Sequence, residues 1–100
     1  MTYVDELATE IQRHVPSRLL PTGDLKPLFR LYALLALTKG RSVSPEDVHN
    51  AWVVWMLEQD PNHHALKPFD TLDADTQASD APCAEAIHAV IAERLERASA

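Results

Sequence analysis

The chain has 100 residues, of which 46% are hydrophobic, 9 are lysine or arginine and 15 are aspartate or glutamate. A chain of this length builds one core, so the sequence predicts a single domain over residues 1–100. The formal net charge of -6, with no basic run, argues against nucleic acid and against an anionic membrane surface as partners.

The cysteine count, the length of the apolar runs and the charges near the N-terminus disfavour disulfide-bonded, zinc-binding, membrane-spanning and secreted proteins. The single cysteine, Cys83, excludes an intrachain disulfide and a zinc site built from several cysteines. The longest apolar run, residues 31–37, is far shorter than the roughly 20 residues that span a bilayer. Acids stand near the N-terminus, at Asp5 and Glu6, where a signal peptide carries basic residues. We therefore expect a cytoplasmic protein with no membrane association.

The first helix is predicted to begin at Thr2, a candidate N-cap with Asp5 three residues on, and to end before Pro16. Its apolar residues form one stripe at helical spacing: Val4, Leu7, Ala8, Ile11 and Val15. The next segment is bounded by prolines and ends in glycine, which predicts a loop, and we expect Leu19 and Leu20 to pack into the core.

A second helix is predicted after Asp24 as its N-cap, with Pro27 in its first turn and a C-terminal signal at Lys39-Gly40. Residues 28–37 are apolar on nearly every side, which is typical of a central helix covered by several neighbours. Any apolar surface that three short neighbours leave uncovered would favour a homodimer.

The third helix has the clearest start, because Ser44-Pro45-Glu46-Asp47 combines an N-cap, a first-turn proline and acids that favour a helix N-terminus. It is expected to end at Gln59, before a proline turn. Trp52 and Trp55 are three residues apart and point in different directions, so we expect one in the core. The other is either partly exposed, as a binding anchor, or buried as well.

Residues 61–73 are predicted to form an irregular loop, which Leu66, Phe69 and Leu72 attach to the core. Asp73 is a candidate cap for the short turn that follows it.

The last helix is predicted to begin near Pro82 and to carry a second apolar stripe: Cys83, Ile87, Val90, Ile91 and Leu95. The predicted fold class is therefore all-α. It is a compact four-helix single domain with an irregular, pinned loop between helices three and four, and with the second helix at its centre.

An ordered series of unusual residues follows the start of the third helix. The series reads His49-x-x-Trp52, a histidine after the turn, Leu66, Lys67-Pro68-Phe69-Asp70-x-Leu72, Gln77 and then Asp80 before the final helix. This order resembles the ryanodine-receptor-type (RyR) domain over about residues 25–92. Phe69 stands where that family has tyrosine, and the family's Gly-Trp-x-Tyr-Gly segment is missing. The whole chain also resembles small uncharacterised proteins of actinobacteria and their phages.

The resemblance implies an all-helical domain and, by analogy, a nucleotide-derived signal as ligand in phage–host conflict. The residues expected to bind a ligand or partner are His49, Trp52, His64, Lys67 and Asp70. In such a pocket Trp52 would supply a stacking surface, Lys67 a cation and the others hydrogen bonds. The competing interpretation is structural: His49 braces the loop, and Asp70 caps the turn after it.

Metal and enzyme sites are weighed against ordinary structural roles. Zinc needs about four ligands, whereas the side chains of the adjacent His63 and His64 are expected to diverge into solvent, so no metal site is predicted. Cys83 is expected on a buried face as an inert apolar group. No nucleophile elbow, phosphate loop or dinucleotide-binding motif occurs. Paired carboxylates lie at helix starts and on polar faces, where they complement the helix dipole.

We therefore expect a non-enzymatic binding module with no catalytic residues and no cofactor. Its predicted action is contact with a protein partner or with itself. The alternative, from a different class, is a sensor or sequestering protein that holds a small anionic ligand near Lys67 and Trp52.

Overall fold

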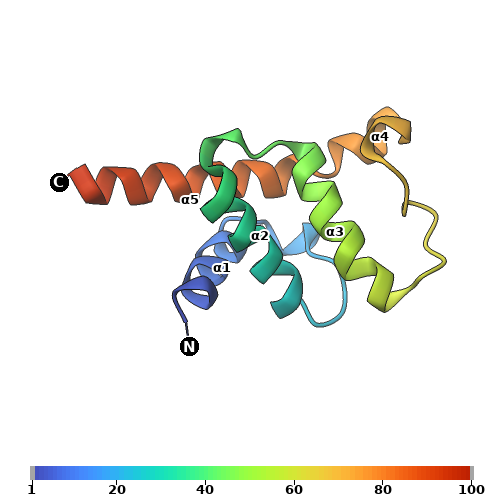
Figure 1. The fold of residues 1–100 in the computed structure, drawn as a ribbon, viewed down its shortest axis with the longest axis horizontal. Coiled ribbons are helices and arrows are strands. Elements are labelled where there is room, and N and C mark those ends of the chain that lie inside the picture. The colour runs from blue at the N-terminus through green and yellow to red at the C-terminus, as the bar shows by residue number, and fades with distance from the viewer. Residues whose placement is uncertain (1, 100) are drawn as a thin grey trace.

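Five α-helices follow one another along the chain: α1 (Tyr3–Arg13), α2 (Lys26–Lys39), α3 (Pro45–Gln59), α4 (Ala74–Ala78) and α5 (Ala81–Ser99). Short 3-10 turns lie between them: η1 (Ser17–Leu19), η2 (Gly40–Ser42) and η3 (Phe69–Thr71). The computed structural model describes residues 2–99 and contains no strand within them (Figure 1). Four long helices confirm the predicted all-α class, and α4 is the short turn predicted after Asp73.

The core forms around one face of α2, as its apolar sequence predicts. In Figure 1, α2 lies between α1 and α3, while α5 runs along the longest axis of the molecule and extends past the other helices at its C-terminal end. The largest fully buried side chains come from all four long helices: Ile11, Leu28, Phe29, Val48, Ile87 and Val90. Helix α2 is therefore the hub of the fold, because α1, α3 and α5 all contact it.

Capping boxes open α1 and α3 where the sequence predicts them. The Thr2 hydroxyl accepts a hydrogen bond from the Asp5 backbone N–H, and the Asp5 carboxylate accepts one from the Thr2 backbone N–H. Ser44 and Asp47 repeat this exchange at the start of α3. Both boxes satisfy backbone donors that a helix start leaves without partners.

The predicted cap of α2 is wrong by one residue. Leu25 precedes the helix and already has helical backbone angles (φ -86°, ψ -9°), so the extended geometry that a side-chain cap requires is absent. Asp24 instead accepts a hydrogen bond from the Lys26 backbone N–H. Its backbone carbonyl accepts the indole N–H of Trp55 at 3.1 Å.

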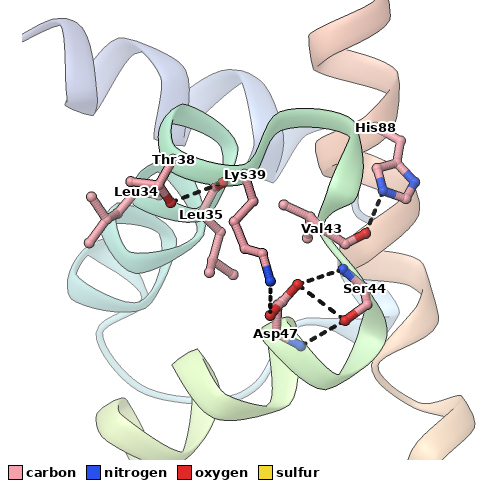
Figure 2. A network of polar contacts seen from close by, with 8 residues as sticks. All are labelled: Leu34, Leu35, Thr38, Lys39, Val43, Ser44, Asp47 and His88. Carbon is pink, nitrogen blue, oxygen red and sulfur yellow. Dashed lines mark hydrogen bonds and ion pairs between the residues drawn. The ribbon is translucent and has the colours of Figure 1, made fainter.

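A polar network joins α2, α3 and α5 at one end of the molecule (Figure 2). Lys39 Nζ donates to Asp47 Oδ1 at 2.9 Å, and the Ser44 backbone N–H donates to Asp47 Oδ2 at 2.9 Å. His88 of α5 donates from Nε2 to the carbonyl oxygen of Val43 at 2.6 Å. The connection between α2 and α3 is thus held from both helices and from α5.

Gly40 ends α2, as the Lys39-Gly40 pair predicts. Its backbone has φ 55° and ψ -127°, a conformation that side chains with a Cβ rarely adopt. The chain therefore turns toward α3 at a position where glycine avoids the strain that a Cβ would bring.

Two leucines that the sequence places in the core are exposed. Leu19 is 47% exposed and Leu95 is 46% exposed. Leu19 lies in a single 3-10 turn between prolines, and Leu95 lies in the last turns of α5. In the loop, Leu66, Phe69 and Leu72 are half-buried but lie outside the main core cluster, so other contacts attach the loop.

The cap of α3 gives a stability prediction with a defined pH dependence. Burial alone would raise the pKa of Asp47, but hydrogen bonds from Lys39 and Ser44 outweigh it and lower the pKa. We expect Asp47→Ala to lower the free energy of unfolding in urea by about 1 kcal/mol at pH 7. The lowered carboxylate pKa stabilises the fold above its unfolded value of about 4, and this contribution disappears as the pH falls through the folded pKa.

Glu46→Ala is the matched control, because Glu46 is exposed in the same first turn and forms no part of the capping box. Equal losses in the two variants would contradict the assignment. A difference between wild type and Asp47→Ala that does not shrink below about pH 4 would also contradict it.

Candidate functional site

A pocket of about 290 Å³ opens where α3, the loop after it and the start of α5 meet α2. Apolar and aromatic side chains form most of its lining: Leu19, Pro21, Leu28, Phe29, Tyr32, Trp52 and Ala65. The polar lining groups come from α3, the loop and the α4–α5 region: His49, His63, His64, Thr76, Ser79, Asp80 and Cys83. The site therefore draws on segments that are distant in the sequence.

A continuous series of rings forms one wall of this pocket. The ring of Trp52 stacks on that of His49 at 5.7 Å between centroids and meets the His63 ring edge-on at 5.0 Å. Trp52 is half-buried, whereas Trp55 is 4% exposed and belongs to the core. Of the two alternatives left open by the sequence, the one with one tryptophan in the core and the other partly exposed is therefore correct.

The adjacent histidines do not diverge as predicted. The rings of His63 and His64 stack at 4.5 Å between centroids. His63 Nδ1 accepts the backbone N–H of Ala65 at 3.0 Å, so the chain turns here. In a turn, unlike a strand, neighbouring side chains are not forced to opposite faces. His64 is exposed, as expected, while His63 is half-buried against Trp52.

His49 is the residue that attaches the loop to the helices. It is 2% exposed, and its Nε2 lies 2.7 Å from the backbone carbonyl oxygen of Lys67. A carbonyl oxygen only accepts, so Nε2 carries the hydrogen of this bond. The structural interpretation, in which His49 braces the loop, is confirmed.

The other ring nitrogen of His49 faces Asp80. The Nδ1 atom lies 3.6 Å from Asp80 Oδ2, and the Asp80 side chain is 13% exposed. Burial raises the pKa of Asp80 to about 6, while His49 opposes that rise. Because Nε2 holds the ring hydrogen, a neutral Nδ1 would turn its lone pair toward an ionised carboxylate. At 3.6 Å the two atoms also lie beyond ordinary hydrogen-bond distance, so no hydrogen bond joins His49 to the Asp80 carboxylate.

The remaining ionisable groups of the lining are Tyr32 and Cys83, which lie on α2 and α5. Burial raises the pKa of the Tyr32 hydroxyl and of the Cys83 thiol. Both groups are therefore uncharged at neutral pH, and a neutral thiol is a poor nucleophile. Asp80 is the one aspartate or glutamate among the described residues that line the pocket.

The five residues expected to bind a ligand are only partly brought together. His49, Trp52 and His64 line the pocket. Lys67 contributes its backbone carbonyl to His49, but its side chain is exposed and lies outside the lining. Asp70 is exposed on η3 and does not cap the next helix. Asp73 does so, accepting the Thr76 backbone N–H at 2.8 Å, because α4 begins one residue after it.

The lining residues that escaped the sequence reasoning about a site include Tyr32, Cys83 and Asp80. Tyr32 fits the apolar pattern of α2, so no local signal marks it as a pocket residue. Cys83 was assigned to the core. Asp80 did carry a signal, since it occupies the acid position before the last helix in the RyR-like pattern, yet it was not placed among the binding residues.

Neither a metal site nor a membrane-spanning helix is present within residues 2–99. No group of three histidine, cysteine or acidic side chains there is arranged to hold a metal ion. None of the helices described in this range is long and apolar enough to cross a membrane.

Comparison with known proteins gives a family match. A family model described as a domain of unknown function, DUF7701, matches residues 2–92. The matched range contains every residue that lines the pocket and ends within α5. No curated protein and no solved structure matches the chain.

The contact between His49 and Lys67 predicts local loosening of the loop. His49→Phe keeps a ring but leaves the Lys67 carbonyl without its donor, which costs about 1–3 kcal/mol when the group stays buried. We expect faster amide exchange across residues 61–73 in this variant, measured by hydrogen–deuterium exchange.

His88→Phe is the matched control, because it removes the same kind of bond to a carbonyl oxygen, that of Val43. It should leave exchange in residues 61–73 unchanged. Equal acceleration of that segment in both variants would show that His49 has no specific role there.

Proposed function

We propose that this chain, which belongs to the DUF7701 family, is a non-enzymatic binding module whose pocket beside Trp52 holds a small flat ligand. One observation carries the proposal. Trp52 is half-buried at the wall of a mostly apolar hollow, with His49 stacked on it and His63 against its edge. A rigid aromatic surface of this kind favours stacking by a planar group.

The size of the pocket limits the ligand. Ligand pockets in proteins span about 300–1,000 Å³, and this one, at about 290 Å³, lies at the lower limit. A single ring or a fused pair of rings fits such a volume, and a larger ligand would leave part of itself outside.

The ionisation of the lining supports binding rather than catalysis. The thiol of Cys83 is held neutral by burial, and the Tyr32 hydroxyl is held neutral in the same way. Neither supplies an activated nucleophile at neutral pH. The similarity to the RyR-type domain supports the same segment, since His49 and Trp52 belong to that pattern and both line the pocket. A cytoplasmic role in phage–host conflict belongs to this proposal.

Ligand binding by the pocket is testable with planar fragments. We expect at least one of indole, adenine and benzamidine to raise the melting temperature of the full chain, because binding to the folded state stabilises it. Trp52→Leu should remove the shift while far-ultraviolet circular dichroism stays helical.

Asn50→Ala is the matched control, because Asn50 is an exposed α3 residue outside the pocket lining. It should keep the fragment-induced shift. Fragment binding that survives in Trp52→Leu would rule out the proposed site, and so would the absence of binding by every fragment.

A second candidate function, self-association, is favoured by exposed apolar side chains on two neighbouring helices. Leu34 and Leu37 of α2 are 53% and 49% exposed, and Val54 and Leu57 of α3 are 55% and 50% exposed. We call these four residues the α2–α3 patch. The sequence predicted that α2 would keep uncovered apolar surface.

A second copy of the chain is the occupant that this patch suits. Residues 31–38 and 48–57 contain no lysine, arginine, aspartate or glutamate. Two such faces can therefore meet without bringing like charges together, although each chain carries a net charge of -6.

Self-association gives its own prediction. If the α2–α3 patch joins two copies, sedimentation velocity of the wild type will show a dimer, and Leu34→Glu combined with Val54→Glu will show a monomer. Leu95→Glu is the matched control, because Leu95 is equally exposed but lies on α5. A wild type that sediments as a monomer at high concentration would overturn this candidate.

A further inference from the structure

We infer that the pocket selects a flat cation whose N–H groups pair with the Asp80 carboxylate, an amidinium or a guanidinium being the chemical class that fits. This inference rests on the proposed binding function of the pocket and specifies its ligand. It reverses the ligand charge expected from the sequence, where Lys67 was assigned as the binding cation.

The charges of the lining favour a cation. Asp80 is the acid of the pocket, and neither lysine nor arginine is among the described residues that line it. The side chain of Lys67 lies outside the lining. A phosphate or carboxylate ligand would therefore meet Asp80 without a fixed positive charge beside it.

The Asp80 carboxylate also has acceptor capacity to spare. Its ion-pair partner among the described residues is His49, whose Nδ1 at 3.6 Å lies beyond ordinary hydrogen-bond distance. Two carboxylate oxygens offer about four lone-pair positions. An amidinium or guanidinium presents two parallel N–H groups that match a carboxylate in a bidentate pair.

The aromatic wall suits the same ligand. Tryptophan is the aromatic residue whose ring face attracts cations most strongly, and flat delocalised cations also stack on such rings. The Trp52 ring is fixed by His49 on α3 and by His63 in the loop. A planar cation can therefore stack on Trp52 while its N–H edge points to Asp80.

Protonation of the pocket sets the expected pH dependence. Burial raises the pKa of Asp80 to about 6, and a bound cation favours the ionised carboxylate. The titratable groups that line the pocket together with Asp80 are His49 on α3, His63 and His64 in the loop, Tyr32 on α2 and Cys83 on α5. Because the Asp80 carboxylate ionises as the pH rises through this range, the affinity for a cation should rise from pH 5 to pH 7.5.

The test compares three ligands of nearly the same shape on the full chain by isothermal titration calorimetry: benzamidine, neutral benzamide and anionic benzoate. We expect benzamidine to bind about tenfold or more tightly than the other two at pH 7.5. Asp80→Asn should weaken benzamidine about tenfold, leave benzamide unchanged and abolish the rise in benzamidine affinity between pH 5 and pH 7.5.

Asp73→Asn is the matched control, because Asp73 is an exposed acid outside the lining, and asparagine also caps helices well. It should leave benzamidine binding unchanged. Benzamide or benzoate binding as tightly as benzamidine, lost in Trp52→Leu, would overturn the cation inference and leave the binding function standing. An unchanged benzamidine affinity in Asp80→Asn would overturn it equally. If neither these ligands nor indole and adenine bind, the proposed function itself is wrong.

Discussion

The hydrogen bond from His49 Nε2 to the Lys67 carbonyl oxygen attaches the irregular loop between α3 and α4 to the helices. A buried carbonyl needs a donor, and here the donor comes from a helix whose start is fixed by its own capping box. A second bond, from Gln77 Nε2 to the carbonyl oxygen of Phe69 at 2.9 Å, holds the next part of the same loop. These two bonds to backbone carbonyls, together with the buried Ala65 and the contact of the Phe69 ring with His49 at 6.1 Å between centroids, hold the loop. The bond from His49 to Lys67 also directs His49 Nδ1 toward Asp80.

The pocket depends on the core as well as on the loop. Phe29 and Tyr32 of α2 are 1% and 3% exposed, yet both contribute to the lining, so one layer of side chains serves core and site. Their rings meet edge-on at 5.1 Å between centroids, which is a favourable aromatic arrangement. Because close-packed side chains cannot shift without disturbing their neighbours, the pocket floor is formed in advance of any ligand. Binding there would require little ordering of the protein.

Four of the nine lysine and arginine residues form ion pairs outside the pocket: Arg30, Lys39, Arg94 and Arg97. Arg30 pairs with Asp5 at 2.7 Å, joining α2 to α1, and holds the pKa of that carboxyl well below its usual range. Arg94 pairs with Glu10 at 3.0 Å, joining α5 to α1. Exposed ion pairs contribute little stability, so their main effect is on which helix faces meet. Since neither of these arginines lines the pocket, Asp80 has no lysine or arginine beside it there, which supports the inferred preference for a cation.

The sequence by itself determined the helices, because caps and apolar stripes act over a turn or two of chain. Thr2 with Asp5 and Ser44 with Asp47 specify two helix starts through bonds that span three residues. The same local reasoning misplaced the start of α2, where a contact with the distant Trp55 fixes the backbone of Asp24. Which tryptophan is buried, how His63 and His64 stack, and which of the predicted site residues reach the pocket were decided only by the tertiary structure. The physical reason is that the pocket joins α2, α3 and α5, and the angles at which they pack depend on side chains from the whole core.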